Sequence, residues 1–598
     1  MCGINGFNFR DEELLGRMNE RIRHRGPDQD GIFLDNNISL GHRRLSIIDL
    51  SEKGRQPIFN EDKSLCLVFN GEIYNFQELR KDLLEKGHRF YSQTDSEVIL
   101  HLYEDYQENC LKFLDGIFVF AVWDIKNKEL FLARDRIGVK PLYYYHKDNK
   151  FIFSSEIKAI LEHNIKREVN LEALNHYFRL MYVPAPLTMF KNIYKLPQAH
   201  YLKLKNVGGE TSHIEIKKYW DLSGFKEITS KQEIMEKIRD LMKKSVKGQL
   251  ISDRPVGIFL SGGIDSTSVL GIAREFKKDK IKTFSVGFDI NDSDNKFNAD
   301  FLLARQTSRF YNTEHHELIV SSKDVLENIE KVVYHLDEPV AEPTQIATFL
   351  LSKLAKKEVA VVLGGDGGDE LFGGYKRYYY SYLLNRFWLT KLFPFLKSRI
   401  HARFMFQKEK EIDKILNRNI NQPKLTERFF RKNHLEKYSD ADFEKLFMIT
   451  DLKTWLADES LMRSDKMTMA FGLEQRVPVL DHQLVELAMK IPSKYKISSK
   501  NQGKAIFIEA MRDYLPKHIL ESEKKKVWMT PMSEWLRTEL NSRAIEILSP
   551  DYFLENKKYF NFDNIQKMFV DHINKKRYNL NLIWAVIVFQ IWCKKYLA

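Results

Sequence analysis

The chain has 598 residues, 43% of them hydrophobic and 29% charged, which is ordinary for a soluble globular protein but too long for one hydrophobic core. Its four cysteines lie far apart without a C-x-x-C pair, which argues against a disulfide framework or a zinc ribbon and favours a reducing cytoplasm. The net charge of +12 arises from 94 basic residues interleaved with 82 acidic ones, so we expect a solvated surface and neither a nucleic-acid nor a membrane partner.

The N-terminal sequence MCGINGF places a cysteine at position 2. Removal of Met1 would leave Cys2 with a thiol and a free α-amine on the same residue. The thiol has an ordinary pKa of about 8.5 and the amine one of about 8, so an uncharged amine can take the thiol proton and later return it to a leaving group. Cys2 is therefore a candidate nucleophile, and the alternative is a small residue without a catalytic role.

Short apolar runs typical of strands dominate the first third of the chain. They lie at 66–70, 116–124, 129–135 and 151–156, with one helical segment at 76–87. This pattern predicts an α+β domain with antiparallel sheet. The polar, glycine-bearing stretch 205–213 suits a turn or a linker, so we expect a first domain at 2–210 and a second at 230–598.

The second domain begins with alternating helical and strand patterns. Helices are predicted at 232–250, 265–278, 299–311 and 323–357, and strands at 255–260, 281–288, 315–320 and 358–364. This alternation predicts a doubly wound parallel sheet with helices on both faces. Beyond residue 375 the pattern is mainly helical, and the aromatic and basic stretch 387–406 is interpreted as a buried helical segment, with a partner or membrane surface as the alternative.

The motif LSGGIDS at 260–266 lies between a predicted strand and a predicted helix. Such a turn offers close backbone approach and a helix N-terminus, which together form a cradle for phosphate or pyrophosphate. Asp265 would repel phosphate unless a cation lay between them, so we interpret it as a magnesium ligand, with Ser266 as a hydroxyl donor. The alternative is a tight turn in which Asp265 caps the helix. No G-x-x-x-x-G-K-[ST] loop is present.

A second glycine-rich turn, LGGDGGDELFGGY at 363–375, follows the strand at 358–364. In the predicted topology it faces the same crevice as the first turn, since the carboxyl ends of parallel strands lie at one edge. A magnesium site shared by Asp265 and Asp369 is therefore expected. The alternative is a surface turn of solvated acidic residues.

Several motifs together carry a family resemblance. SGGIDS resembles the pyrophosphatase loop of ATP-pyrophosphatases. Joined to MCGI and four further motifs, it makes the chain resemble glutamine-hydrolysing asparagine synthetases over nearly its whole length: RHRGPD at 23–28, GHRRLSIID at 41–49, NGEIYN at 70–75 and TDSEVIL at 94–100. The resemblance implies an N-terminal-nucleophile glutaminase with an αββα sandwich, followed by an ATP-pyrophosphatase domain with a helical extension. It also implies ATP as a substrate, Mg²⁺ as a cofactor and an internal passage for ammonia.

In the first domain, the resemblance makes Cys2 the nucleophile that attacks the carboxamide of glutamine. Asn70 and the backbone N–H of Gly71 would form the oxyanion hole. Arg44 would bind the glutamine α-carboxylate, while Asp95 and Glu72 would hold the α-ammonium. The glutamine site implied in this way consists of Arg44, Leu45, Ser46, Ile47, Ile48, Asn70, Gly71, Glu72 and Asp95. Taken singly, the charged residues could instead form surface salt bridges.

In the second domain, the resemblance implies a site for ATP and pyrophosphate made of Leu260, Ser261, Gly262, Gly263, Asp265, Ser266, Val286, Gly364, Gly365 and Arg476. Lys504 matches the family's lysine that stabilises the charge formed when ammonia attacks the acyl-adenylate; otherwise it is a solvated surface lysine. Asp366 stands where many members carry a glutamate tied to adenylate formation.

This chain departs from the family pattern near that position. It has GGDGGDE where asparagine synthetases often have SGEGSDE, so Gly364 and Gly367 replace serines, and Gln475 replaces a small apolar residue. Related amidotransferases that act on sugar uronic acids share this form. Aspartate is the expected acceptor, and the alternatives are another carboxylate, a non-catalytic paralogue and a tRNA-modifying ATP-pyrophosphatase, which would leave the first domain unexplained. The expected partners are small molecules, and a homodimer stays open.

Overall fold

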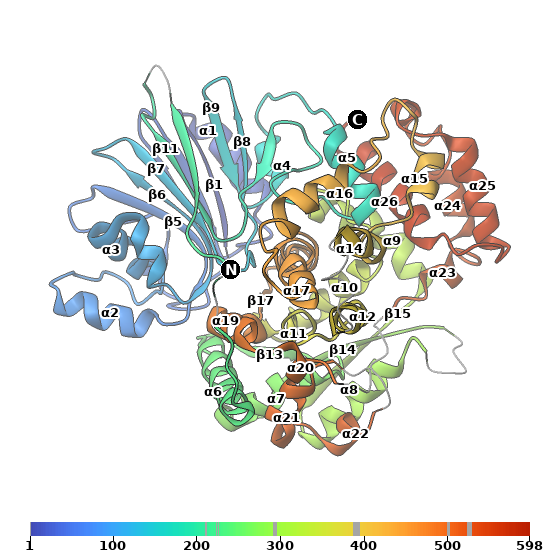
Figure 1. Cartoon of the computed structure of the whole chain (residues 1–598). Coiled ribbons are helices and arrows are strands. Elements are labelled where there is room, and N and C mark those ends of the chain that lie inside the picture. Colours follow the sequence, from blue (N-terminus) through green and yellow to red (C-terminus); the bar gives the residue numbers. More distant parts are fainter. Residues whose placement is uncertain are drawn as a thin grey trace.

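The structure is a computed structural model of the chain, and it describes residues 2–209, 212–222, 224, 226–290, 296–386, 395–498, 503–522 and 529–598. Two stacked sheets form the N-terminal half, and a parallel sheet surrounded by helices forms the rest (Figure 1). Within these described ranges, no helix is long and apolar enough to span a membrane.

The N-terminal half contains two six-stranded antiparallel sheets. The first has the order β10-β8-β9-β1-β3-β2 and the second the order β12-β11-β7-β6-β5-β4. The strands are β1 Gly3–Phe7, β2 Gln29–Leu34, β3 Ser39–Arg44, β4 Ile58–Phe59, β5 Leu65–Ile73, β6 Gly116–Asp124, β7 Glu129–Arg134, β8 Tyr143–Lys147, β9 Lys150–Ser154, β10 Ile193–Lys195, β11 His200–Lys205 and β12 His213–Lys218.

Apolar side chains on alternate strand positions fill the space between the two sheets, as expected for stacked sheets. Ile4 and Leu40 of the first sheet pack with Val68 and Val119 of the second. The helices α2 (Phe76–Glu85) and α3 (Glu97–Tyr106) cover the outer face of the second sheet, and α1 (Glu12–Arg21) and α4 (Ile157–Ile160) lie on the first. The predicted αββα sandwich is confirmed.

A five-stranded parallel sheet forms the centre of the second half, with the order β15-β14-β13-β16-β17. Its strands are β13 Val256–Phe259, β14 Lys282–Phe288, β15 Glu314–Val320, β16 Val361–Leu363 and β17 Glu474–Arg476. Ile258 and Leu363 pack on one face against α6 (Lys231–Gln249) and α7 (Ile264–Phe276), while Phe284 and Val362 pack on the other against α10 (Gln345–Ala355). The predicted doubly wound sheet is confirmed.

Helices dominate the remainder of the second half (Figure 1). They are α8 Ala299–Phe310, α9 Ser322–Leu336, α11 Gly368–Phe372, α12 Lys376–Arg386, α14 Phe395–Met405, α15 Glu409–Ile415, α16 Leu425–Phe430, α17 Phe443–Lys453, α18 Met462–Met469, α19 His482–Lys490, α20 Ser493–Lys496, α21 Ala505–Ala510, α22 Lys517–Leu520, α23 Met532–Trp535, α24 Asn541–Ile547, α25 Phe562–Ile573 and α26 Leu580–Tyr596. Helix α5 (Leu171–Leu180) precedes β10 in sequence but packs against these helices of the second half. For example, Tyr177 donates a hydrogen bond to the Ala585 carbonyl of α26.

Three local predictions need correction or refinement. The single helix expected at 323–357 is two helices, α9 and α10, because Pro339 and Pro343 in the segment between them lack the N–H that a continuing helix needs. The stretch 205–213 joins β11 to β12 within one sheet, so that sheet continues to Lys218; the boundary at 210 itself stays a prediction. Residues 387–394 lie outside the described ranges, and 395–405 form α14. The predicted burial is only partly correct there, because His401 is buried but Phe404 is 40% exposed.

Candidate functional site

Cys2 lies directly before β1, and its side chain is buried with 7% exposure. Its backbone N–H donates to Asn70 Oδ1 at 2.9 Å. Asn70 is fully buried on β5, and its Nδ2 has no hydrogen-bond partner among the residues that the structure describes. A buried amide donor without a partner costs free energy, so its presence beside Cys2 indicates a place prepared for an incoming acceptor atom.

The environment of the Cys2 thiol contains opposing influences. Burial raises the pKa of the thiol, while the backbone N–H of Leu45 and the positive charge of Arg44 favour the thiolate. Next to the site, Gly71 admits no side chain, because a Cβ there would lie 2.1 Å from the backbone oxygen of Ile117. The backbone N–H of Gly71 is thus kept close to the position of Asn70.

The loop that follows β3 carries the predicted residues 44–48. Arg44 is buried and donates to the backbone oxygens of Ser51 at 2.9 Å and Ile48 at 3.2 Å, so its guanidinium holds the loop together. Leu45 and Ile47 pack against Ala360 and Val361, the start of β16. The Ser46 carbonyl accepts a bond from Arg254 at 2.8 Å. The predicted glutamine loop is therefore anchored on the second half of the chain.

Two buried carboxyl groups complete the predicted glutamine site. Burial raises the pKa of Asp95 to about 6, although its Oδ2 accepts the Ile73 N–H at 2.8 Å. Burial also raises the pKa of Glu72, which is opposed by Arg476 at 3.1 Å. Burial disfavours the ionised form of both carboxyl groups in the unliganded site. A cationic group bound there would favour that form, so the site suits an ammonium group.

At the other site, the two glycine-rich turns meet at the carboxyl edge of the parallel sheet, after the paired strands β13 and β16. Ser261 and Ser266 lie with their hydroxyl oxygens 3.0 Å apart at the start of α7. Gly262 has a φ of +73°, and a Cβ at Gly365 would lie 2.6 Å from the Ser266 nitrogen. Of the remaining predicted members, Leu260 and Gly364 directly follow β13 and β16, Val286 lies on β14, and Gly263 is the N-cap of α7.

The predicted magnesium ligands come together around a lysine. Lys504 Nζ lies 2.5 Å from Asp265 Oδ2 and 2.9 Å from Asp369 Oδ1. Burial opposes the charged form of Lys504, but the two carboxylates outweigh it and raise its pKa. Asp265 Oδ1 is buried and accepts no hydrogen bond from any described residue. This unsatisfied oxygen fits a divalent cation, for which carboxylate oxygens are suitable ligands.

The model of the asparagine synthase family matches residues 237–594, and that of the glutamine amidotransferase domain matches residues 1–220. The chain belongs to the asparagine synthase family. "Asparagine synthetase [glutamine-hydrolyzing] 1" of Bacillus subtilis (strain 168) is 34% identical over 99% of this chain and 96% of its own length. A second relative from that strain, "Asparagine synthetase [glutamine-hydrolyzing] 3", is 34% identical over 90% of each chain. A third, from Oryza sativa subsp. japonica, is 29% identical over 88% of this chain and 76% of its own.

The residues that depart from the asparagine synthase family pattern contact one another. Gln475 Nε2 donates to Asp366 Oδ2 at 2.7 Å. A Cβ at Gly364 would lie 2.4 Å from that oxygen and 2.7 Å from the Gln475 nitrogen. A Cβ at Gly364 would displace the ends of both side chains, so Gly364, Asp366 and Gln475, three of the four positions that depart from the family pattern, form one corner beside the second glycine turn.

Arg463 of α18 was not predicted, although it lies close enough to influence Asp366. Burial raises the pKa of Asp366, and the charge of Arg463 opposes that effect. Arg463 Nε donates to Glu459 Oε1 at 2.6 Å. The sequence does contain a glutamate four residues before this arginine, a spacing that predicts an ion pair on a helix. Such pairs usually lie on an exposed helix face, whereas both of these side chains are buried.

Arg476 lies differently from the other predicted phosphate ligands. Its guanidinium donates to the backbone oxygens of Gln249 at 2.8 Å and Ile251 at 2.6 Å, and pairs with Glu72 and Glu474. The side chain is fully buried and connects β17 to Glu72 on β5. Contact between Arg476 and phosphate stays a prediction.

Proposed function

We propose that this protein is a glutamine-dependent asparagine synthetase that uses ATP. The observation that carries the proposal is the presence of both halves of the chemistry in one chain: Cys2 beside the unpaired amide of Asn70, and Lys504 between the carboxylates of Asp265 and Asp369. Relatives that carry this name match the chain over nearly its whole length.

The first reaction takes place at Cys2. After removal of Met1, the neutral α-amine accepts the thiol proton, and the sulfur attacks the carboxamide carbon of glutamine. Asn70 Nδ2 and the Gly71 N–H donate to the oxygen that becomes negative, as in other acyl-transfer sites. Return of the proton to the nitrogen releases ammonia, and water then cleaves the thioester to give glutamate.

The second reaction activates aspartate at the glycine-rich turns. The β-carboxylate of aspartate attacks the α-phosphorus of ATP, giving an acyl-adenylate and pyrophosphate. The N–H groups at the start of α7 and the hydroxyls of Ser261 and Ser266 would bind the phosphate oxygens. Mg²⁺, held by Asp265 and Asp369, would supply positive charge to the same oxygens.

Ammonia completes the reaction by displacing AMP from the acyl-adenylate, which forms the amide of asparagine. Lys504 is placed to stabilise the negative charge that develops in this step, because its Nζ already lies among the charged groups of the site. Ammonia must reach this site without protonation, since ammonium is not a nucleophile.

A second candidate is the same chemistry with another carboxylate as acceptor. The contact between Asp366 and Gln475 favours this candidate, because positions that depart from the family pattern lie together here, next to the adenylation turn.

Measurement of AMP formation with glutamine, MgATP and a panel of carboxylates tests the proposal. We expect AMP and asparagine with aspartate. AMP formation with a uronic acid but not with aspartate would favour the second candidate, and AMP formation with none of them would favour a non-catalytic role.

Replacement of the nucleophile tests the coupling of the two sites. Cys2→Ala should lower the rate of product formation with glutamine by at least about 1000-fold, but retain most product formation with free ammonia. Cys66→Ala is the matched control, since this thiol is buried within the sandwich. Equal losses with both nitrogen sources in Cys2→Ala would contradict the two-site mechanism.

A further inference from the structure

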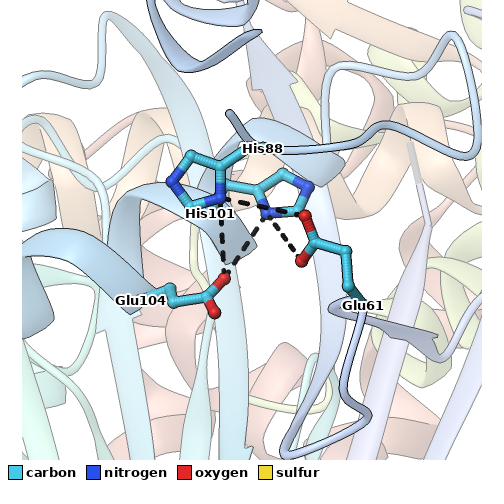
Figure 2. Close-up of side chains that lie close together, drawn as sticks. All are labelled: Glu61, His88, His101 and Glu104. Atoms are coloured by element: carbon cyan, nitrogen blue, oxygen red, sulfur yellow. Dashed lines mark ion pairs between the residues drawn. The ribbon is translucent and has the colours of Figure 1, made fainter. Parts of the chain in front are cut away.

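Four ionisable side chains converge on the outer side of the sandwich, away from Cys2 in sequence and in fold. They are Glu61, His88, His101 and Glu104 (Figure 2). His101 and Glu104 lie on α3, His88 follows α2, and Glu61 follows β4. The proposed reaction uses none of them.

The distances between these groups are slightly longer than those between the ligands of one ion. The Nδ1 atom of His101 lies 3.7 Å from Glu61 Oε2 and 3.6 Å from Glu104 Oε2, and Nδ1 of His88 lies 3.8 Å from Glu104 Oε2. These separations exceed normal hydrogen bonds. A tetrahedral ion with bonds of about 2.0–2.2 Å places its ligand atoms about 3.3–3.6 Å apart. The four groups therefore surround a space of nearly the correct size.

His101 gives the second indication. Its side chain is only 1% exposed, and neither ring nitrogen has a hydrogen-bond partner among the described residues. Buried imidazoles normally find a partner for both nitrogens. Figure 2 shows its ring directed toward Glu61 and Glu104, so the unsatisfied Nδ1 points into the space between the four groups.

Hydrogen bonds from outer residues also fix the orientation of the ligand side chains, as in natural metal sites. His88 Nε2 lies 3.0 Å from Asp105 Oδ1, which leaves Nδ1 available on the inner side. Asn60 donates to Glu104 Oε1 at 3.3 Å, and the Arg89 N–H donates to Glu61 Oε1 at 2.8 Å. In both carboxylates the second oxygen, Oε2, faces His101.

We propose that Glu61, His88, His101 and Glu104 form a binding site for a divalent transition-metal ion of the zinc class. Two imidazole nitrogens and two carboxylate oxygens suit Zn²⁺, whereas Mg²⁺ and Ca²⁺ prefer oxygen ligands alone. The half-exposed carboxylates leave an entry path from solvent, since the side chains of Glu61 and Glu104 are 36% and 37% exposed.

Occupation of the site would fix the segment after α2 against α3. That segment continues through Ser92 and Thr94, whose hydroxyls lie 2.7 Å apart, to Asp95 of the predicted glutamine site. The ion would thus have a structural role, restraining the approach to the glutamine site. The proposal does not depend on the acceptor carboxylate or on any step of the reaction.

The test is metal binding by the full chain after treatment with a chelator. Equilibrium dialysis measures the stoichiometry of Zn²⁺, and the visible absorption of bound Co²⁺ reports tetrahedral coordination by nitrogen and oxygen. We expect one ion per chain at micromolar free metal, and a thermal midpoint that rises with Zn²⁺ and falls with EDTA.

Substitutions assign the ion to its ligands. His101→Gln and His88→Gln should each weaken binding by at least about 100-fold, and Asp105→Asn, which acts behind His88, by about 10–100-fold. His316→Gln is the matched control, because His316 lies in another His and Glu group, with Glu314 and Glu358, on β15 and near β16. Cys2→Ala controls for binding by the reactive thiol.

Two results would overturn the proposal: less than one Zn²⁺ retained per chain at micromolar metal, or unchanged stoichiometry in both histidine variants. In either case the four groups form only a network of polar side chains without an ion. If His101→Gln fails to fold, His88→Gln and Glu61→Gln decide, since both of these side chains lie nearer the surface.

Discussion

At the scale of single residues, one hydrogen bond sets the orientation of the Asn70 amide beside Cys2. Its Oδ1 is fixed by the Cys2 N–H, so the amide cannot turn over, and Nδ2 is left with no partner among the described residues. A buried, unpaired donor of this kind costs about 1–3 kcal/mol. Under the proposed function, a hydrogen bond from Nδ2 to the oxyanion would offset this cost.

Asn70→Ala should therefore lower kcat for glutamine hydrolysis by about 100- to 1000-fold, with a smaller change in KM. Product formation with free ammonia should stay within about twofold, because the second site is unchanged. Steady-state assays of glutamate release and AMP release measure the two activities separately. Gln232→Ala, exposed on α6, is the control, and a loss below tenfold in Asn70→Ala would remove Asn70 from the oxyanion hole.

Asp95 gives a prediction for pH. Burial raises its pKa in the folded protein from 3.8 to about 6, so the folded state holds a proton that the unfolded state has released. The stabilisation is fully present below pH 3.8 and is lost as the pH rises through about 6. Relative to Asp95→Asn, the wild-type thermal midpoint should fall by about 2–4 °C between pH 4.5 and 7.

Differential scanning calorimetry of the unliganded protein across this range measures the difference. Asp82→Asn, exposed on α2, should run parallel to the wild type. A wild-type midpoint that rises relative to Asp95→Asn over the same interval would show that the carboxyl group is stabilised in its ionised form.

At the scale of secondary-structure elements, α18 joins the two sites. Arg463 faces Asp366 beside the second glycine turn, and two residues later Asp465 accepts a bond from Arg25 at 2.8 Å. Arg25 in turn donates to the Cys2 carbonyl at 3.1 Å. All of these charged groups except Asp366 are buried, so a movement of α18 would be felt at both ends.

Asp465→Asn should weaken this connection. The substitution leaves Arg25 and Lys140 without a full counter-charge; Lys140 lies 3.3 Å from Asp465. Breaking a buried pair of this kind lowers the free energy of unfolding by about 3–5 kcal/mol. We expect a lower thermal midpoint and more glutamate released per asparagine formed. The ratio of the two products and a thermal melt measure this, with Asp440→Asn as the exposed control. An unchanged ratio would show that α18 has no coupling role.

At the scale of the whole molecule, the alternation of helices and strands predicted the parallel sheet, and the short apolar runs of the first third predicted antiparallel sheet. The motifs also predicted that the two glycine-rich turns lie at one sheet edge, because short spacings fix strand-to-helix turns. The roles of the site residues stay predictions, and Arg476 pairs with Glu72 and Glu474. The sequence could not predict β17, since Glu474–Arg476 has no apolar pattern and becomes a strand only by pairing with β16. It also could not predict that Arg25 and Asp465 are buried together, because isolated charged residues are usually solvated. The path of α5 into the helical half depends on tertiary packing in the same way.

The buried pairing of Arg25 and Lys140 from one half with Asp465 from the other restricts the exchange of halves between relatives. A glutaminase half moved onto the synthetase half of a distant relative would meet a surface on which these charges have no assured partners. Chimaeras should then assemble only when the matching acidic residue is carried across with them.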